Sequence, residues 1–118
     1  MSTAAVIKWG SRVVGREEQA AEVFTEALGY LGELKAAGKV TDFEPFIQRT
    51  GSPGGFLVIK GEAHDVASVI DSDRFKMIQS KALYVVEDFG IEYLYAADEI
   101  PDVMMLGQKA YAELGLTR

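Results

Sequence analysis

The sequence predicts one α+β domain in which helices cover a face of an antiparallel sheet. Its 118 residues suit a single domain of ordinary size, so we assign residues 1–118 to one unit. Apolar residues make up 48% of the chain and charged residues 25%, the balance of a soluble globular protein. Along the chain, stretches with the two-residue period of strands alternate with stretches of the helical period. These observations predict the class of fold before any motif is considered.

The first two elements are a strand over residues 5–14 and a helix over residues 16–37. The strand is rich in Val and Ile, and Gly10 within it marks a bulge or a close backbone contact. In the helix, apolar residues recur every three or four positions and glutamates occupy the other side. Gly29 and Gly32 each cost about 1 kcal/mol there relative to Ala. Close packing against the sheet and simple tolerance both explain them.

A β-hairpin follows. Residues 40–49 alternate, with Phe43 on one face and Phe46 on the other. Pro45 cannot donate a ladder hydrogen bond, which predicts an edge strand or a strand with a break. Residues 50–55 have turn chemistry, and residues 56–61 form a short strand bounded by glycines.

The second half contains more helix and a last strand. A helix over residues 63–70 is interrupted at residues 71–73, because short polar side chains favour caps and turns, and it resumes over residues 74–83. A strand follows over residues 90–97. A final helix opens near Pro101, where the missing N–H does no harm. Its apolar stripe predicts packing on the protomer or on a partner copy: Val103, Leu106, Ala110, Leu114.

The element order is that of a ferredoxin-like βαββαβ fold, with an antiparallel sheet and an added C-terminal helix. The helices suffice to cover only one face of this sheet. If Phe46, Val58 and Leu94, or the residues that alternate with them, lie on the other face, the apolar side chains there need cover. We therefore expect a homodimer formed through the sheet face.

This order, together with the helix break in Val69-Ile70-Asp71-Ser72-Asp73-Arg74-Phe75 and the polar-then-aromatic segment 85–95, resembles the dimeric α+β barrel superfamily. That superfamily includes the antibiotic-biosynthesis monooxygenase, EthD, YCII-related and muconolactone-isomerase types. The resemblance spans nearly the whole chain and implies an architecture, because this fold carries many activities. It transfers no catalytic role. His64 and Asp65 are adjacent here, unlike the His–Asp pair of the YCII-related type, and the chain lacks the Asn that haem-degrading members use.

Composition excludes several classes of protein. A formal charge of −6 argues against binding to nucleic acid or to a membrane surface, since affinity for phosphate depends on Lys and Arg. A ferredoxin-like RNA-binding module needs exposed aromatic residues among basic ones, and Phe56 alone does not supply them. The absence of Cys excludes disulfides and thiolate chemistry. With neither a signal peptide nor an apolar run of about 20 residues, we expect a cytoplasmic protein.

The candidate ligand-binding residues lie on the predicted strands. Alternation places Lys8 opposite Trp9; we expect Trp9 to fill the core and Lys8 to face the interior of the dimeric barrel with other polar side chains. An equally open interpretation is that these polar residues lie at the ends of the sheet in water, or form ion pairs between subunits. Two roles are open for Tyr93. It either stacks on a ligand or is a half-buried strand residue with its hydroxyl in solvent. The candidate binding set is Lys8, Glu44, Gln48, Glu92 and Tyr93, with Lys60 beside it.

His64 is the one candidate catalytic residue. It is the only His of the chain, and His readily exchanges protons near neutral pH, so a general base at a pocket edge is conceivable. An exposed residue at the start of a helix is the commoner role for such a His. A metal site built with Glu62 or Asp65 would need adjacent residues to aim at one ion. We therefore expect no metal and no cofactor.

The sequence thus predicts a homodimer that binds a small organic molecule in a pocket between the sheet and the helices, non-catalytic or of unassigned activity. The alternative is a cofactor-independent monooxygenase or isomerase acting on a small organic substrate. The two differ in whether the pocket contains a proton-transfer group with a shifted pKa.

Overall fold

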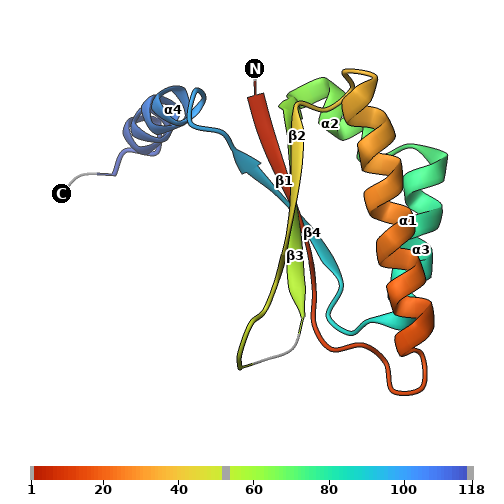
Figure 1. The fold of residues 1–118 in the computed structure, drawn as a ribbon. Helices are drawn as coiled ribbons and strands as arrows, with labels where there is room; N and C mark the ends of the chain where they lie inside the picture. The colour runs from red at the N-terminus through yellow and green to blue at the C-terminus, as the bar shows by residue number, and fades with distance from the viewer. Residues whose placement is uncertain (1, 52–53, 117–118) are drawn as a thin grey trace.

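The body of the molecule has two layers, a sheet and a layer of helices, in a computed structural model that describes residues 2–51 and 54–116 (Figure 1). Part of the predicted turn, residues 52–53, lies outside the described residues. The elements are β1 (Ser2–Trp9), α1 (Glu17–Ala36), β2 (Asp42–Ile47), β3 (Gly55–Glu62), α2 (Ala63–Ile70), α3 (Asp73–Val85), β4 (Gly90–Tyr95) and α4 (Ile100–Glu113).

The sheet has the strand order β2-β3-β1-β4, and every neighbouring pair is antiparallel. This confirms the predicted ferredoxin-like topology, and β2 lies at an edge, as Pro45 requires. In the register, Val6 pairs with Val58 on one side and with Glu92 on the other. Paired residues share a face, so the register identifies every side chain that faces away from the helices.

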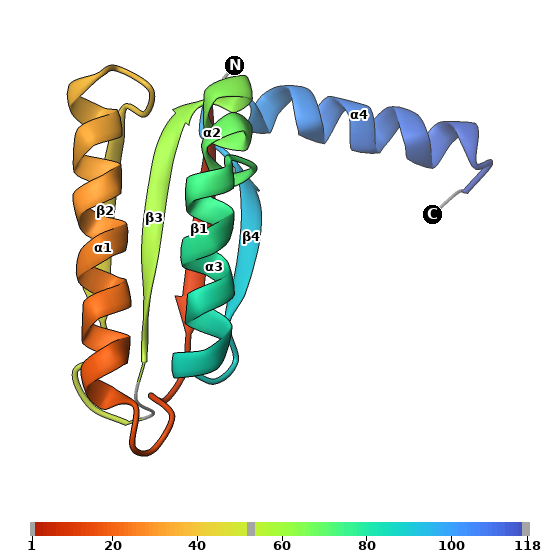
Figure 2. The ribbon, with the colours of Figure 1, turned by 90° about the vertical axis from the view of Figure 1, so that its right-hand side faces the viewer.

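Helices α1 and α3 cover one face of the sheet, and the core lies between the layers (Figure 2). Ala5 and Ile59 from the sheet are fully buried there, as is Leu31 from α1. Trp9 packs against this core, as predicted, and meets Phe24 of α1 edge to face with ring centroids 5.6 Å apart. The helix layer therefore accounts for one face of the sheet only.

The first strand is shorter than predicted. It ends at Trp9, and the chain then follows the end of α3 instead of continuing along the sheet. Gly10 donates its backbone N–H to Glu87 O at 2.7 Å, and Val13 donates to Val85 O at 2.9 Å. A Cβ on Gly10 would lie 3.3 Å from Glu87 O, so this glycine marks the close backbone contact that the sequence suggested.

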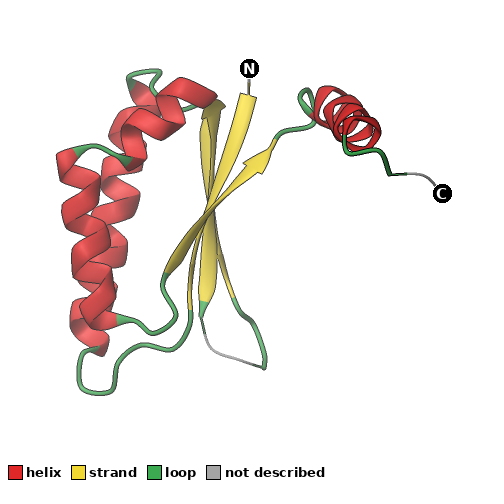
Figure 3. Cartoon of the chain, turned by 180° about the vertical axis from the view of Figure 1, so that it is seen from behind, coloured by secondary structure: helices red, strands yellow, loops and turns green. Residues whose placement is uncertain are grey.

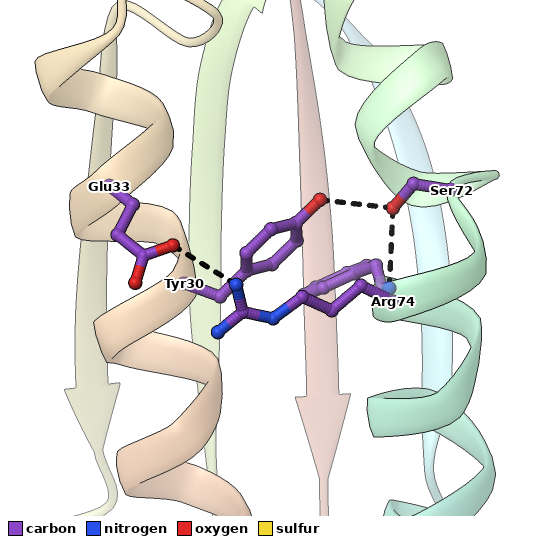
Figure 4. Close-up of polar contacts among 5 residues, drawn as sticks. Tyr30, Glu33, Ser72 and Arg74 are labelled. Atoms are coloured by element: carbon purple, nitrogen blue, oxygen red, sulfur yellow. Dashed lines mark hydrogen bonds and ion pairs between the residues drawn. The ribbon is translucent and has the colours of Figure 1, made fainter.

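A small polar cluster joins α1 to the turn between α2 and α3 (Figure 4). Ser72 is the N-cap of α3 and accepts a hydrogen bond from the backbone N–H of Phe75 at 3.2 Å. The Ser72 hydroxyl is also 3.2 Å from the Tyr30 hydroxyl. Arg74 lies over the Tyr30 ring, 4.4 Å from its centroid, and its Nη1 is 3.0 Å from Glu33 Oε2. The cluster holds the two covering helices together.

Helix α4 stands apart from this body, on the side of the sheet that α1 and α3 leave bare (Figures 1 and 3). None of its residues 100–113 is buried. The sequence predicted that this helix packs either on its own protomer or on a partner copy. The first of these two predictions is therefore wrong. Within the described part of the chain, no helix combines the length and the apolar character needed to cross a membrane.

Candidate functional site

A cavity of about 420 Å³ lies between the sheet and helices α1 and α3. It occupies the end of the domain where β1 stops and β3 begins, and its walls include Ile7, Trp9, Phe24, Leu57, Phe75 and Ile78. Pockets for small organic molecules span about 300–1,000 Å³ and are lined mainly by apolar side chains. In size and lining, this cavity resembles such a pocket.

Small residues on the helices create the space. Ala20 and Ala27 of α1 and Ala82 of α3 all line the cavity, where larger side chains would fill the gap between the layers. Trp9 and Phe24 form a rigid aromatic wall, because their edge-to-face contact fixes both rings. The cavity therefore follows from alanines placed where a helix faces a sheet.

Among the described lining residues are the polar side chains of Arg12, Gln48 and Gln79. Gln79 donates its amide N–H to Ile70 O at 2.8 Å, and the Gln48 amide donates to Thr50 O. Among the described residues, Arg12 makes no ion pair. The described lining contains no Asp, Glu or His. The described part of the lining thus offers a cation and amides to a ligand, and it contains no carboxylate or imidazole to act as a base.

The predicted binding residues do not gather at this cavity. Lys8, Glu44 and Glu92 lie on the opposite face of the sheet, where Lys8 and Glu92 form an ion pair with each side chain about half exposed. Gln48 alone of the predicted set borders the cavity. Ligand binding by the open-face residues, within a dimer, stays a prediction.

Tyr93 lies on the helix-facing side of β4, at the edge of the sheet, and it is half exposed. Burial of part of the side chain raises the pKa of Tyr93, and the negative charge of Asp71 raises it further. A tyrosine hydroxyl can both donate and accept a hydrogen bond. It does not line the cavity.

His64 is exposed at the second position of α2 and does not line the cavity. The start of this helix is capped by Glu62, whose side chain accepts a hydrogen bond from the backbone N–H of Asp65 at 3.2 Å. Among residues 2–51 and 54–116, no three acidic or His side chains are grouped closely enough to hold a metal ion. The setting of His64 is that of an ordinary helix residue in solvent.

Sequence reasoning missed Arg12 and Gln79 as lining residues. Arg12 was assigned to a strand, whereas it lies in the loop after β1 beside Val86. Gln79 lies on α3 next to the buried Ile78. The available signal was the run of alanines on the apolar side of α1, which predicts space between that helix and the sheet.

The sequence matches no protein-family model and no curated protein. The structure, by contrast, resembles several solved ones. A variant of SnoaB, a cofactor-independent oxygenase from Streptomyces nogalater, superposes with a TM-score of 0.65 at 8% identity, over 81% of this chain and 93% of that one. A dimeric ferredoxin-like protein of unknown function from Jannaschia sp. CCS1 gives 0.58 at 14% identity, over 80% and 96%.

A dimeric protein of unknown function and ferredoxin-like fold from Bacteroides fragilis NCTC 9343 gives a TM-score of 0.61 at 10% identity, over 80% of this chain and 96% of that one. At these identities the likeness concerns the fold. The chain therefore has the ferredoxin-like fold of these solved structures, and the fold predicted from its sequence is confirmed.

Proposed function

We propose that this protein is a homodimer that binds a small apolar molecule in the cavity between its sheet and helices α1 and α3. The observation that carries the proposal is the cavity itself: about 420 Å³, with walls of aromatic and aliphatic side chains. Water in such a space finds few hydrogen-bond partners, because most of the lining is apolar. An apolar ligand that displaces this water removes apolar surface from solvent, which favours binding.

The dimer is proposed from the uncovered face of the sheet. We define the open face as the side of the sheet away from α1 and α3. Its centre is apolar, with Val6 next to Val58 and with Phe46 and Phe56 each 42% exposed. A soluble monomer seldom leaves such a patch in water, and a second copy covers it by two-fold symmetry.

The polar lining selects among apolar ligands. Arg12 is the one charged side chain among the described lining residues. A ligand with an aromatic or aliphatic body and an anionic group therefore places its body against Trp9 and Phe24 and its charge beside Arg12. Because Arg12 is exposed, this contact adds less than a buried ion pair would.

The test uses the neutral fluorophore N-phenyl-1-naphthylamine. Trp9 is the only Trp of the chain and lines the cavity, so its fluorescence reports occupancy. We expect saturable quenching by the fluorophore in the wild type. Ala27→Phe, which fills the cavity, abolishes the quenching, whereas Ala36→Phe on the exposed end of the same helix preserves it. Equal binding by the two variants contradicts the proposed site.

The charge preference is tested with 8-anilinonaphthalene-1-sulfonate, an anionic relative of the first probe. Arg12→Gln weakens binding of the anion by roughly 3- to 10-fold, the effect of a contact worth about 1 kcal/mol, and leaves the neutral probe unaffected. Arg49→Gln removes an exposed charge that does not line the cavity and serves as the control. An equal loss of affinity for both probes in Arg12→Gln would show that Arg12 only supports the fold.

A second candidate function is cofactor-independent oxygenation of the bound molecule. The likeness of the fold to SnoaB favours it over other reactions. Because no described carboxylate or His lines the cavity, the substrate itself must ionise readily, as a phenol or enol does. Oxygen consumption with a hydroxylated polycyclic aromatic compound, in the absence of flavin and metal, tests this activity. Consumption that Ala27→Phe leaves unchanged would contradict it.

A further inference from the structure

Helix α4 exposes an apolar surface that its own protomer does not cover. At 3.6 residues per turn, Val103, Ala110 and Leu114 lie along one side of the helix. Leu114 is 74% exposed, and Leu106, near this side, is 65% exposed. The opposite side includes Lys109 and Ala112, with one large apolar residue, Met105, that is 68% exposed. We call the side that bears Val103, Ala110 and Leu114 the apolar side of α4. It also includes Ile100, Met104 and Tyr111.

A helix of this length does not stand alone in water. Isolated helices shorter than about 12–15 residues are marginal even with favourable sequences. Helix α4 has 14 residues, and Gly107 in its interior costs about 1 kcal/mol relative to Ala. Its N-cap residue, Glu99, makes no side-chain capping hydrogen bond. The stability of α4 must therefore come from packing its apolar side against another molecule.

The position of α4 identifies that molecule. The helix lies on the open-face side of the sheet, and Figure 2 shows it extending beyond β4, away from α1. A second copy that covers the open face occupies the space on that same side of the sheet. The helix of each copy then lies within reach of the other copy, and two-fold symmetry makes the exchange reciprocal.

The area available on the open face and on α4 also fits a second copy of the chain as the partner. Four strands of six or eight residues, about 4.8 Å apart and rising about 3.3 Å per residue, span a flat area of roughly 440 Å². A stable interface between two proteins buries about 800 Å² on each partner. The flat area of the sheet is about half of this value, and the side chains that project from it bring the accessible area of the open face closer to it. The apolar side of a helix about 21 Å long supplies additional area contiguous with the sheet.

We infer that α4 is a dimerisation arm, whose apolar side packs on the second copy in the homodimer. The inference rests on the proposed dimer and adds to it a second contact region, separate from the open face. In this arrangement each copy contacts the other through two regions, its open sheet face and its helix α4. The sheet defines the symmetry axis, and the arm strengthens the association.

Two alanines of α4 provide a matched test. Ala110 lies on the apolar side and Ala112 on the opposite side, and both are exposed in the protomer. We expect Ala110→Glu to raise the dimer dissociation constant at least about tenfold, because it places an unpaired carboxylate in the interface. Ala112→Glu changes it by less than about twofold, as an exposed substitution does. Sedimentation velocity over a dilution series measures both constants.

The outcomes separate the arm from the dimer itself. Equal effects of the two substitutions, in a wild type that is dimeric, would overturn the arm and leave the sheet-face dimer intact. A monomeric wild type would overturn both proposals. Amide hydrogen exchange gives an independent readout: we expect protection of residues 100–113 in the dimer and its loss in the open-face variant Val58→Lys, which we expect to be monomeric. Protection retained in a monomeric Val58→Lys protein would also overturn the arm.

Discussion

The rings of Phe46 and Phe56 stack across strands β2 and β3, with centroids 4.9 Å apart and planes inclined by 22°. Both rings belong to the open face, and each is 42% exposed in the protomer. The same cross-strand row continues to Lys8. This aromatic pair beside a charged residue belongs to the face that we propose as the dimer interface.

Val58→Lys is expected to convert the protein into a monomer. Val58 lies at the centre of the open face, and Glu44 is its cross-strand partner, so the new Lys finds an opposite charge within the folded protomer. In the dimer, however, the ammonium groups would lose their water. Val14→Lys, at a residue that is 95% exposed in a loop, is the control. Sedimentation equilibrium at micromolar concentration should give the chain mass for Val58→Lys and twice that mass for the control.

Ser72→Ala is expected to lower the free energy of unfolding by about 1–2 kcal/mol, since it removes the N-cap of α3. The change also deprives the Tyr30 hydroxyl of its contact with Ser72. Ser80→Ala, on the exposed side of the same helix, should change stability by less than about 0.5 kcal/mol. Urea denaturation followed by circular dichroism measures both. Equal losses would mean that the cap contributes nothing specific.

The sequence was sufficient for features that depend on local periodicity. Alternation along residues 42–47 predicts that Phe43 and Phe46 lie on opposite faces, and in the structure Phe43 packs on the core while Phe46 lies on the open face. The helix over Ala63–Ile70 has the predicted bounds. The cavity, by contrast, brings together Arg12 and Gln79, which are far apart in the chain. The period of apolar residues along the chain does not predict that these two residues lie close together, because their proximity depends on how the helix layer packs on the sheet.

Gly29→Ala and Gly32→Ala are each expected to raise the free energy of unfolding, by up to about 1 kcal/mol. A Cβ at either position meets nothing within 4 Å, so these glycines are tolerated and serve no close packing. Gly55→Ala should instead destabilise the protein, because its Cβ would lie 2.2 Å from Phe46 O. Chemical denaturation of the three variants checks the signs. A destabilised Gly29→Ala protein would contradict the open environment seen at that helix position.

Lys35 and Asp42 should give a pH-dependent contribution to stability. A hydrogen bond from Lys35 Nζ, at 2.9 Å, and then one from the backbone of Phe43, lower the pKa of Asp42 from its ordinary value of 3.8. Because the folded-state pKa is lowered, the stabilisation is fully present above pH 3.8 and is lost as the pH falls through the folded-state value.

Lys35→Met should therefore reduce the free energy of unfolding at about pH 6, and the reduction should shrink as the pH falls far enough to protonate Asp42 in the folded state. The effect is small, since the pair is exposed. Lys39→Met is the control, because no ion pair of Lys39 is found among the described residues. A loss for Lys35→Met that does not shrink as the pH falls would contradict the role of the ionised pair.

The most direct test of a ligand-binding homodimer is a crystal structure of the full chain grown with N-phenyl-1-naphthylamine. We predict density for the probe between the sheet and helices α1 and α3, against Trp9 and Phe24, in a two-fold dimer whose open faces meet. A probe bound on the open face of a monomer, with the space beside Trp9 and Phe24 closed by its own side chains, would contradict the account.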